Sequence, residues 1–255
     1  MGEQGITRRI RMKASLVILP IDDYSGRFIQ DSSVRIYIEN EKAPIRKSDG
    51  CRVFLNLFRE SVVVHCDSPI YHSVEKRIDL KNTENITIVK IRMMPNHSYP
   101  LPQQTTCVTG KGKPGETVEL YNISDGVNFR ILGPYKKSGE DADCIQIYNP
   151  SGIELGGKRL HIQNKDFSQS EYFTIIDEEE NHTYRMDAPL QYDYKKVGTL
   201  IQPVYETWVD NNGEFFIPLP DRMQAQSKWL LCYPMRDCSQ EIVLQEGIWN
   251  RIKSV

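Results

Sequence analysis

Apolar and polar side chains alternate along most of this chain, in short runs separated by residues that favour turns. Near the start, alternating runs at residues 34–38 and 53–57 flank the turn-forming sequence KSDG at 47–50. Near the end, the sequence DNNG at 210–213 stands between two further runs of this kind. An alternation of period two buries one face of a strand, and an Asx-Gly pair favours the tight turn of a hairpin. The pattern therefore predicts an all-β chain of tandem small antiparallel β-sandwich domains.

No stretch repeats its apolar residues with the 3.6-residue period of a helix, so strands are predicted throughout. In the first part of the chain they lie at 12–20, 33–39, 51–58, 61–67, 71–80 and 84–94. Their inward-facing side chains would be Leu16, Ile18, Ile36, Phe54, Val62 and Val64. Later strands are predicted at 105–109, 116–121, 128–132, 144–148, 158–163, 171–176, 200–209, 213–219, 228–233 and 240–245. Residues 222–227 could form one helical turn, and residues 248–255 a terminal strand or a short helix.

The first group of strands carries a further pattern of turn residues and apolar positions. Its members are Asp22, Ser25, Gly26, Ile29, Val34, Ile36, Ser48, Asp49, Gly50, Phe54, Leu55, Leu57, Val62, Val64, Ser68 and Tyr71. In this pattern the region from about 12 to 94 resembles the transthyretin-like, carboxypeptidase-regulatory type of β-sandwich. The resemblance implies a non-catalytic spacer, stabiliser or adhesive module, and it carries no catalytic residue over to this chain. Further on, Pro114-Gly115 followed by residues 117–120 resembles the first hairpin of bacterial immunoglobulin-like modules.

Prolines and shifts in composition suggest where the domains begin and end. Three prolines between residues 95 and 102 cannot pair within a central strand, so they indicate a short stiff linker. The predicted organisation is a basic arm at 1–11, a transthyretin-like sandwich at 12–97, a linker at 98–104, an immunoglobulin-like sandwich at 105–190 and a β-rich C-terminal region at 191–255, which could pack with the second domain.

Charge and hydropathy narrow the classes of partner. The net charge of −2 gives nucleic-acid binding no support. The longest early apolar run, residues 16–19, ends at Pro20 and is far shorter than the roughly 20 residues that cross a bilayer. No small-residue cleavage site follows it, so no signal peptide is predicted. We expect cytoplasmic synthesis without membrane insertion, and a final place in a released or membrane-docked particle.

Two glycine-containing segments imitate ligand loops. Residues 110–117 have nearly the spacing of a phosphate-binding loop, but Glu116 stands where the lysine is needed, and no helix is predicted to follow. Residues 210–214 are rich in oxygen atoms, yet five residues between two strands supply fewer ligands than the six to eight oxygens that Ca²⁺ takes. Both segments are interpreted as β-turns, and no cofactor and no metal is predicted.

Cysteine and histidine offer little for catalysis. The six cysteines include no Cys-x-x-Cys pair and are expected to be reduced, although Cys51 could approach Cys66. His65 and Cys66 point to opposite faces of a strand, which prevents them from sharing a substrate. A nucleophilic Cys–His pair assembled from distant strands, for example Cys51 with His65, stays open as an alternative. No catalytic residue is predicted.

Two sets of residues are candidates for binding a partner. The basic arm concentrates positive charge ahead of the first strand at Arg8, Arg9, Arg11 and Lys13. The last quarter of the chain contains all three tryptophans, Trp208, Trp229 and Trp249. We therefore expect a non-catalytic structural or adaptor protein that joins other proteins in a large assembly, by analogy a phage-tail-like or contractile injection particle. The alternatives are a carbohydrate or cell-surface binding module and, third, the accessory domain of a separate enzyme.

Overall fold

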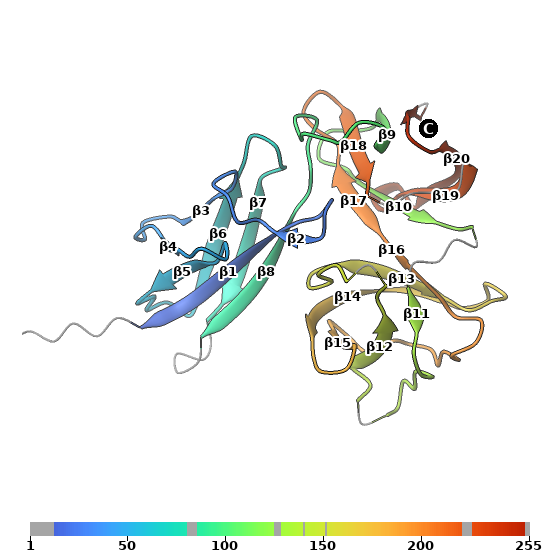
Figure 1. The fold of residues 1–255 in the computed structure, drawn as a ribbon, viewed down its shortest axis with the longest axis horizontal. Coiled ribbons are helices and arrows are strands. Elements are labelled where there is room, and N and C mark those ends of the chain that lie inside the picture. Colours follow the sequence, from blue (N-terminus) through green and yellow to red (C-terminus); the bar gives the residue numbers. More distant parts are fainter. Residues whose placement is uncertain are drawn as a thin grey trace, which may run out of the picture. The chain divides into compact units, whose positions relative to one another are not determined.

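The computed structural model describes residues 13–80, 86–124, 129–139, 141–150, 152–220 and 226–252. Strands make up nearly all of its regular structure, as the alternating pattern predicted (Figure 1). In the described part of the chain the helical structure is a single 3₁₀ turn, η1 (Pro234–Arg236), and no helix there is long and apolar enough to cross a bilayer. Contacts divide the chain into a first unit (the described residues of 1–20, 28–68 and 73–91) and a second unit (those of 21–27, 69–72 and 92–255).

The strands of the first unit form two sheets in the manner of a β-sandwich. One sheet has the order β2 (Arg27–Phe28), β1 (Ala14–Asp22), β5 (Arg52–Leu55), β4 (Ile45–Arg46), and β8 (Thr87–Met93) also pairs with β1. The other sheet has the order β3 (Arg35–Ile38), β6 (Ser61–Asp67), β7 (Val74–Asp79). All six side chains predicted to face inward are buried.

The turn at Gly50 is placed as predicted, between β4 and β5. Gly50 has a φ of 91°, and its N–H donates to the carbonyl oxygen of Lys47 at 3.1 Å. A Cβ atom at this position would lie 2.5 Å from the carbonyl oxygen of Ile29. Glycine is therefore required by both the backbone angle and the space.

The second unit contains a second two-sheet sandwich. One sheet has the order β17 (Tyr205–Trp208), β10 (Thr117–Asn122), β19 (Gln226–Tyr233), β20 (Cys238–Gln245). The other has the order β18 (Glu214–Leu219), β9 (Thr106–Lys111), β21 (Trp249–Arg251), with β21 parallel to β9. A core between the two sheets includes Val118, Leu120, Phe215, Ile217 and Leu231.

Between β10 and β17 the chain forms a separate curled sheet of six strands. Their order is β11 (Arg130–Ile131), β12 (Cys144–Tyr148), β15 (Thr183–Met186), β14 (Ser170–Glu178), β13 (Arg159–Gln163), β16 (Leu200–Pro203). The first and last strands meet because Phe129 bridges Ile201. We call this element, residues 129–203, the barrel. Its interior has its own core, which includes Ile147, Leu160, Phe173, Tyr184 and Ile201.

The pairing of these strands differs from the expected grouping. Residues 105–190 were expected to form one sandwich, but β9 and β10 pair with strands that follow residue 204, and the strands from 130 to 186 belong to the barrel. The reason is that contacts between residues far apart in the sequence decide which strands pair, and the local alternation of apolar and polar residues does not contain this information. Where the domains begin and end as folding units stays a prediction.

The turn at 210–213 also has a different role from the one predicted. Gly213 has a φ of 76° and donates its N–H to Asp210, as a tight turn requires. The flanking strands do not form a hairpin ladder, however, because β17 pairs with β10 and β18 pairs with β9. The turn therefore carries the chain from one layer of the sandwich to the other.

The segment predicted as a linker, 98–104, is packed through Tyr99. The Tyr99 hydroxyl donates to Oδ2 of Asp22 at 2.7 Å. Its ring centroid lies 5.6 Å from that of Tyr24 and 5.5 Å from that of Tyr71. All of these residues belong to the second unit. The segment is thus tied to its surroundings by a hydrogen bond and two aromatic contacts.

Candidate functional site

The structure gives the three tryptophans three different environments. Trp229 is only 4% exposed and lies in the sandwich core, where its Nε1–H donates to Oγ of Ser227 at 2.7 Å. Its burial leaves no surface for a partner. Trp208 is half-buried, and its ring lies 5.1 Å from that of His72. Trp249, in β21, is 58% exposed.

Trp249 is supported from below by another aromatic side chain. Its ring centroid lies 5.6 Å from that of Phe216, which in turn lies 5.1 Å from that of the exposed His97. Phe216 is only 1% exposed, so Trp249 packs against a ring that is itself held in place by burial. We call His97, Phe216 and Trp249 the aromatic row. Ile248, which precedes Trp249 in the chain, is 45% exposed.

Sequence reasoning missed two members of the aromatic row, although the chain contains a signal for one of them. Phe215 and Phe216 are neighbours in β18, and neighbouring residues of a strand face opposite sides. Phe215 belongs to the sandwich core, so Phe216 must lie on the outer face of its sheet. His97 comes from a distant segment and gave no signal, because its position depends on the path of residues 92–102.

The basic arm lies largely outside the described residues, and this includes Arg8, Arg9 and Arg11. Lys13 is described and exposed. Its backbone N–H donates to Oδ1 of Asn56 at 2.9 Å, and its carbonyl accepts from the N–H of Asn56 at 2.8 Å. The arm as a partner-binding element stays a prediction.

A buried group of three charges joins distant segments of the second unit. Asp23 accepts hydrogen bonds from Nη1 of Arg92 at 2.9 Å and from Nζ of Lys158 at 3.0 Å. The side chains of all three are at most 10% exposed. Burial alone would raise the pKa of Asp23, but Lys158 and Arg92 outweigh it and hold that pKa below its ordinary value. Arg92 also donates to the carbonyls of Glu154 and Gly156, so the group has a structural role in connecting segments that are distant in the sequence.

A second buried polar group lies where the barrel meets the sandwich. His161 of β13 stacks on Tyr121 of β10, with ring centroids 4.4 Å apart, and lies 4.8 Å from the ring of Tyr172. Burial, with a smaller contribution from Arg159, lowers the pKa of His161 to about 4. Its Nδ1 has no hydrogen-bond partner among the described residues. With this lowered pKa the ring is neutral at neutral pH and serves in packing.

The two imitation ligand loops are turns, as interpreted from the sequence. In the first, the N–H of Glu116 donates to the carbonyl of Lys113 at 3.0 Å, and its buried carboxylate pairs with Arg236. In the second, Oδ1 of Asp210 accepts the N–H groups of Asn212 and Glu214 at 2.8 and 2.9 Å. Both carboxylates are occupied by their own surroundings.

All six cysteines are unpaired in the structure. Burial raises the pKa of Cys66 and of Cys107 to about 12, so neither is a thiolate at neutral pH. Cys51 precedes β5 in one sheet, whereas His65 lies in β6 of the other sheet and stacks on Tyr37. Within the described ranges, no three metal-ligating side chains are grouped so as to hold an ion.

Comparison with known protein families finds no family model that matches the chain, and comparison with curated proteins finds no significant match. The aromatic row therefore stands on its geometry alone as the candidate surface.

Proposed function

We propose that this chain is a non-catalytic structural or adaptor subunit that works inside a larger multiprotein assembly. The observation that carries the proposal is the exposed Trp249, held on the buried Phe216 of the aromatic row. Tryptophan is among the residues most enriched at the energetic centres of protein interfaces, and exposed apolar surface often marks such a site.

The anchoring of Trp249 supports this role further. A side chain that is already held in place loses little conformational freedom when a partner covers it, and this favours binding. Ile248, the chain neighbour of Trp249, is also exposed, and the exposed His97 adds a polar ring at the other end of the aromatic row. An apolar centre with a polar rim is the usual composition of a protein–protein interface.

The narrower proposal is a subunit of a phage-tail-like or contractile injection particle. It rests on the analogy between small β-sandwich modules and the parts that connect rings in such particles. In this proposal the basic arm, with Arg8, Arg9, Arg11 and Lys13, is a second contact. Deletion of residues 1–11 should weaken incorporation more at low salt than at high salt, because salt screens exposed charges.

Site-specific photocrosslinking in the cells that make the protein tests the proposal. A crosslinking amino acid at position 248 keeps Trp249 in place, and one at position 235 replaces another exposed apolar residue of the same unit, Met235. We expect a discrete protein adduct from position 248 that disappears with Trp249→Ala, and no such adduct from position 235. Equal adducts from both positions, or none, would contradict the proposal.

A carbohydrate-binding module is the second candidate, because a half-exposed indole can stack on a sugar ring. Titration of the isolated chain with oligosaccharides separates the two candidate functions. The tryptophan fluorescence of the native chain is compared with that of Trp249→Phe, so that the contribution of Trp249 is identified. A saturable change that requires Trp249 would favour the sugar, whereas the adaptor proposal expects no saturable change.

A further inference from the structure

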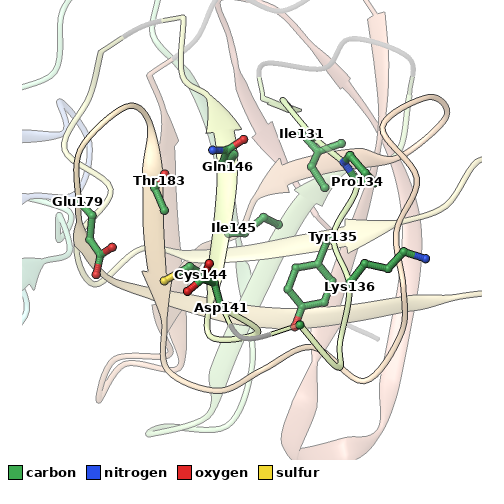
Figure 2. A pocket seen from close by; sticks show the side chains of 12 residues that line it. Ile131, Pro134, Tyr135, Lys136, Asp141, Cys144, Ile145, Gln146, Glu179 and Thr183 are labelled. Carbon is green, nitrogen blue, oxygen red and sulfur yellow. The ribbon is translucent and has the colours of Figure 1, made fainter.

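The barrel contains a pocket, and none of the candidate residues described above is among the residues that line it. It has a volume of about 430 Å³ and opens among β11, β12, β15 and the residues that follow β11. Figure 2 shows Glu179, Cys144 and Asp141 on one side of the pocket and Tyr135 with Pro134 on the other. Every lining residue belongs to the second unit.

Two carboxylates of the pocket have no partner among the described residues. The side chains of Asp141 and Glu179 make no hydrogen bond or ion pair within that part of the chain, and both residues are exposed. Lys136, a basic lining residue, points away from them in Figure 2 and pairs instead with Asp193 at 3.1 Å. Neither carboxylate therefore has an ion-pair partner among the described residues that line the pocket.

The thiol of Cys144 lines the pocket together with the two carboxylates, and their negative charge affects its pKa. The pKa of Cys144 is raised to about 11, first by burial and then by the nearby carboxylates of Asp143, Glu179 and Asp141. A negative potential disfavours a thiolate for the same reason that it favours a cation.

The opposite wall of the pocket is aromatic and rigid. The Tyr135 hydroxyl donates to the carbonyl of Ala142 at 2.6 Å and accepts from the N–H of Leu190 at 2.9 Å. These two bonds fix the ring in the lining. Carboxylates on one side and an aromatic ring on the other are a combination that attracts an organic cation.

We propose that this pocket binds an organic cation, namely the ammonium or guanidinium group of a lysine or arginine side chain or of a free amine. The volume lies in the range of pockets that take whole small organic molecules, so a complete lysine or arginine side chain fits, and it is much larger than a bare ion needs. In the described residues no three ligating side chains are placed to hold a metal. The inference goes beyond the proposed function, since the isolated chain can be tested whether or not it enters an assembly.

Chemical-shift titration of the full chain tests this inference. The probes are n-butylguanidinium and its uncharged analogue n-butylurea, which has nearly the same shape. We expect n-butylguanidinium to shift the backbone amides of Tyr135, Cys144 and Glu179 with a saturable, millimolar dissociation constant, and n-butylurea to shift none of them. Shifts of equal size with both probes, or no shift at these amides, would overturn the inference.

Matched variants link the binding to the two carboxylates. Asp141→Asn with Glu179→Gln should weaken n-butylguanidinium binding by at least about tenfold, the effect of losing a charged hydrogen bond. Glu241→Gln, at an exposed carboxylate of β20 far along the sequence, should leave the affinity unchanged. Unchanged affinity in the double variant, with its spectrum still dispersed, would also overturn the inference.

Two further probes identify the source of the cation. If N-acetyl-argininamide binds as tightly as n-butylguanidinium, the pocket accepts a side chain that is attached to a backbone, as a protein partner would present it. If only n-butylguanidinium binds, the cation is a free amine or guanidine. Tighter binding of Mg²⁺ at the same amides would contradict an organic cation.

Discussion

Gly50 shows how much of the first unit depends on one residue. A methyl group there would lie 2.5 Å from the carbonyl oxygen of Ile29, and the φ of 91° is strained for any other residue. Gly50→Ala should lower the free energy of unfolding by about 2–4 kcal/mol, from backbone strain together with the displaced carbonyl. The shift of the urea midpoint measures the loss.

A matched control separates strain from collision. Asn40, also in the first unit, has a φ of 61° and an exposed side chain. Asn40→Ala changes the preference of the backbone without such a collision and should cost only about 1 kcal/mol. Equal losses in the two variants would show that the contact with Ile29 has no energetic weight.

His161 should make the stability of the second unit depend on pH. Its pKa is about 4 in the folded chain, against 6.5 for an ordinary histidine. Between these values the unfolded chain binds a proton that the folded chain does not, so stability falls as the pH drops from about 6.5 to about 4. His161→Phe keeps the stacking on Tyr121 and Tyr172 but removes the proton.

The expected result is a stability gain for His161→Phe, relative to the native chain, that grows by up to about 3 kcal/mol as the pH falls through this window. Urea unfolding at a series of pH values measures it. His182→Asn, at an exposed histidine, serves as the control. A gain that is independent of pH would show that His161 is readily protonated in the folded chain.

Single residues also show the limit of sequence reasoning. The residues expected to face inward in the first unit are buried, because alternation places the apolar residues of a strand together on one face. Trp229 and Trp249 look alike in the sequence, yet one is in the core and the other is exposed. Alternation gives each strand two faces, but the pairing of distant strands decides which face is covered.

At the scale of elements, the buried group of Asp23, Arg92 and Lys158 should contribute more to the stability of the second unit than any other ion pair described there. Asp23→Asn removes the carboxylate that pairs with both Arg92 and Lys158 in a buried site. The loss should be about 3 kcal/mol or more, since breaking one side of a buried ion pair leaves an uncompensated charge. Thermal or urea unfolding measures the loss.

An exposed pair in the same unit provides the comparison. Asp193 pairs with Lys136, and the two side chains are 47% and 67% exposed. Asp193→Asn should cost less than about 1 kcal/mol, because water and salt screen such pairs. If the two variants lose the same stability, the charges around Asp23 are hydrated and the buried group contributes little to the free energy of unfolding.

The positions of the strands were largely predictable, whereas their partners were not. The predicted strands at 61–67, 144–148 and 213–219 coincide with β6, β12 and β18 to within a residue. The short strand β15 was not predicted, and β21 lies within residues 248–255, for which either a terminal strand or a short helix was predicted. The insertion of the barrel between β10 and β17 was missed, because a run of alternating residues does not encode which strand lies beside it.

At the scale of the whole molecule, the barrel should be removable. Leu120 of β10 pairs with Tyr205 of β17, so the two strands are antiparallel neighbours that a short turn could join directly. A chain in which a glycine-rich turn replaces residues 123–203 should keep the sandwich of the second unit folded. Amide hydrogen exchange should still show protection in β10 and β17. Loss of that protection would mean that the sandwich needs the barrel to fold.

The central claim is that the chain works within a larger assembly through the aromatic row. Its most direct test is sedimentation of the native chain in a gently prepared extract of the cells that make it, with Trp249→Ala alongside. We expect the native chain to sediment well ahead of a 29.5-kDa monomer and the variant to return to the monomer position while staying folded. A native chain that sediments as the monomer would contradict the account.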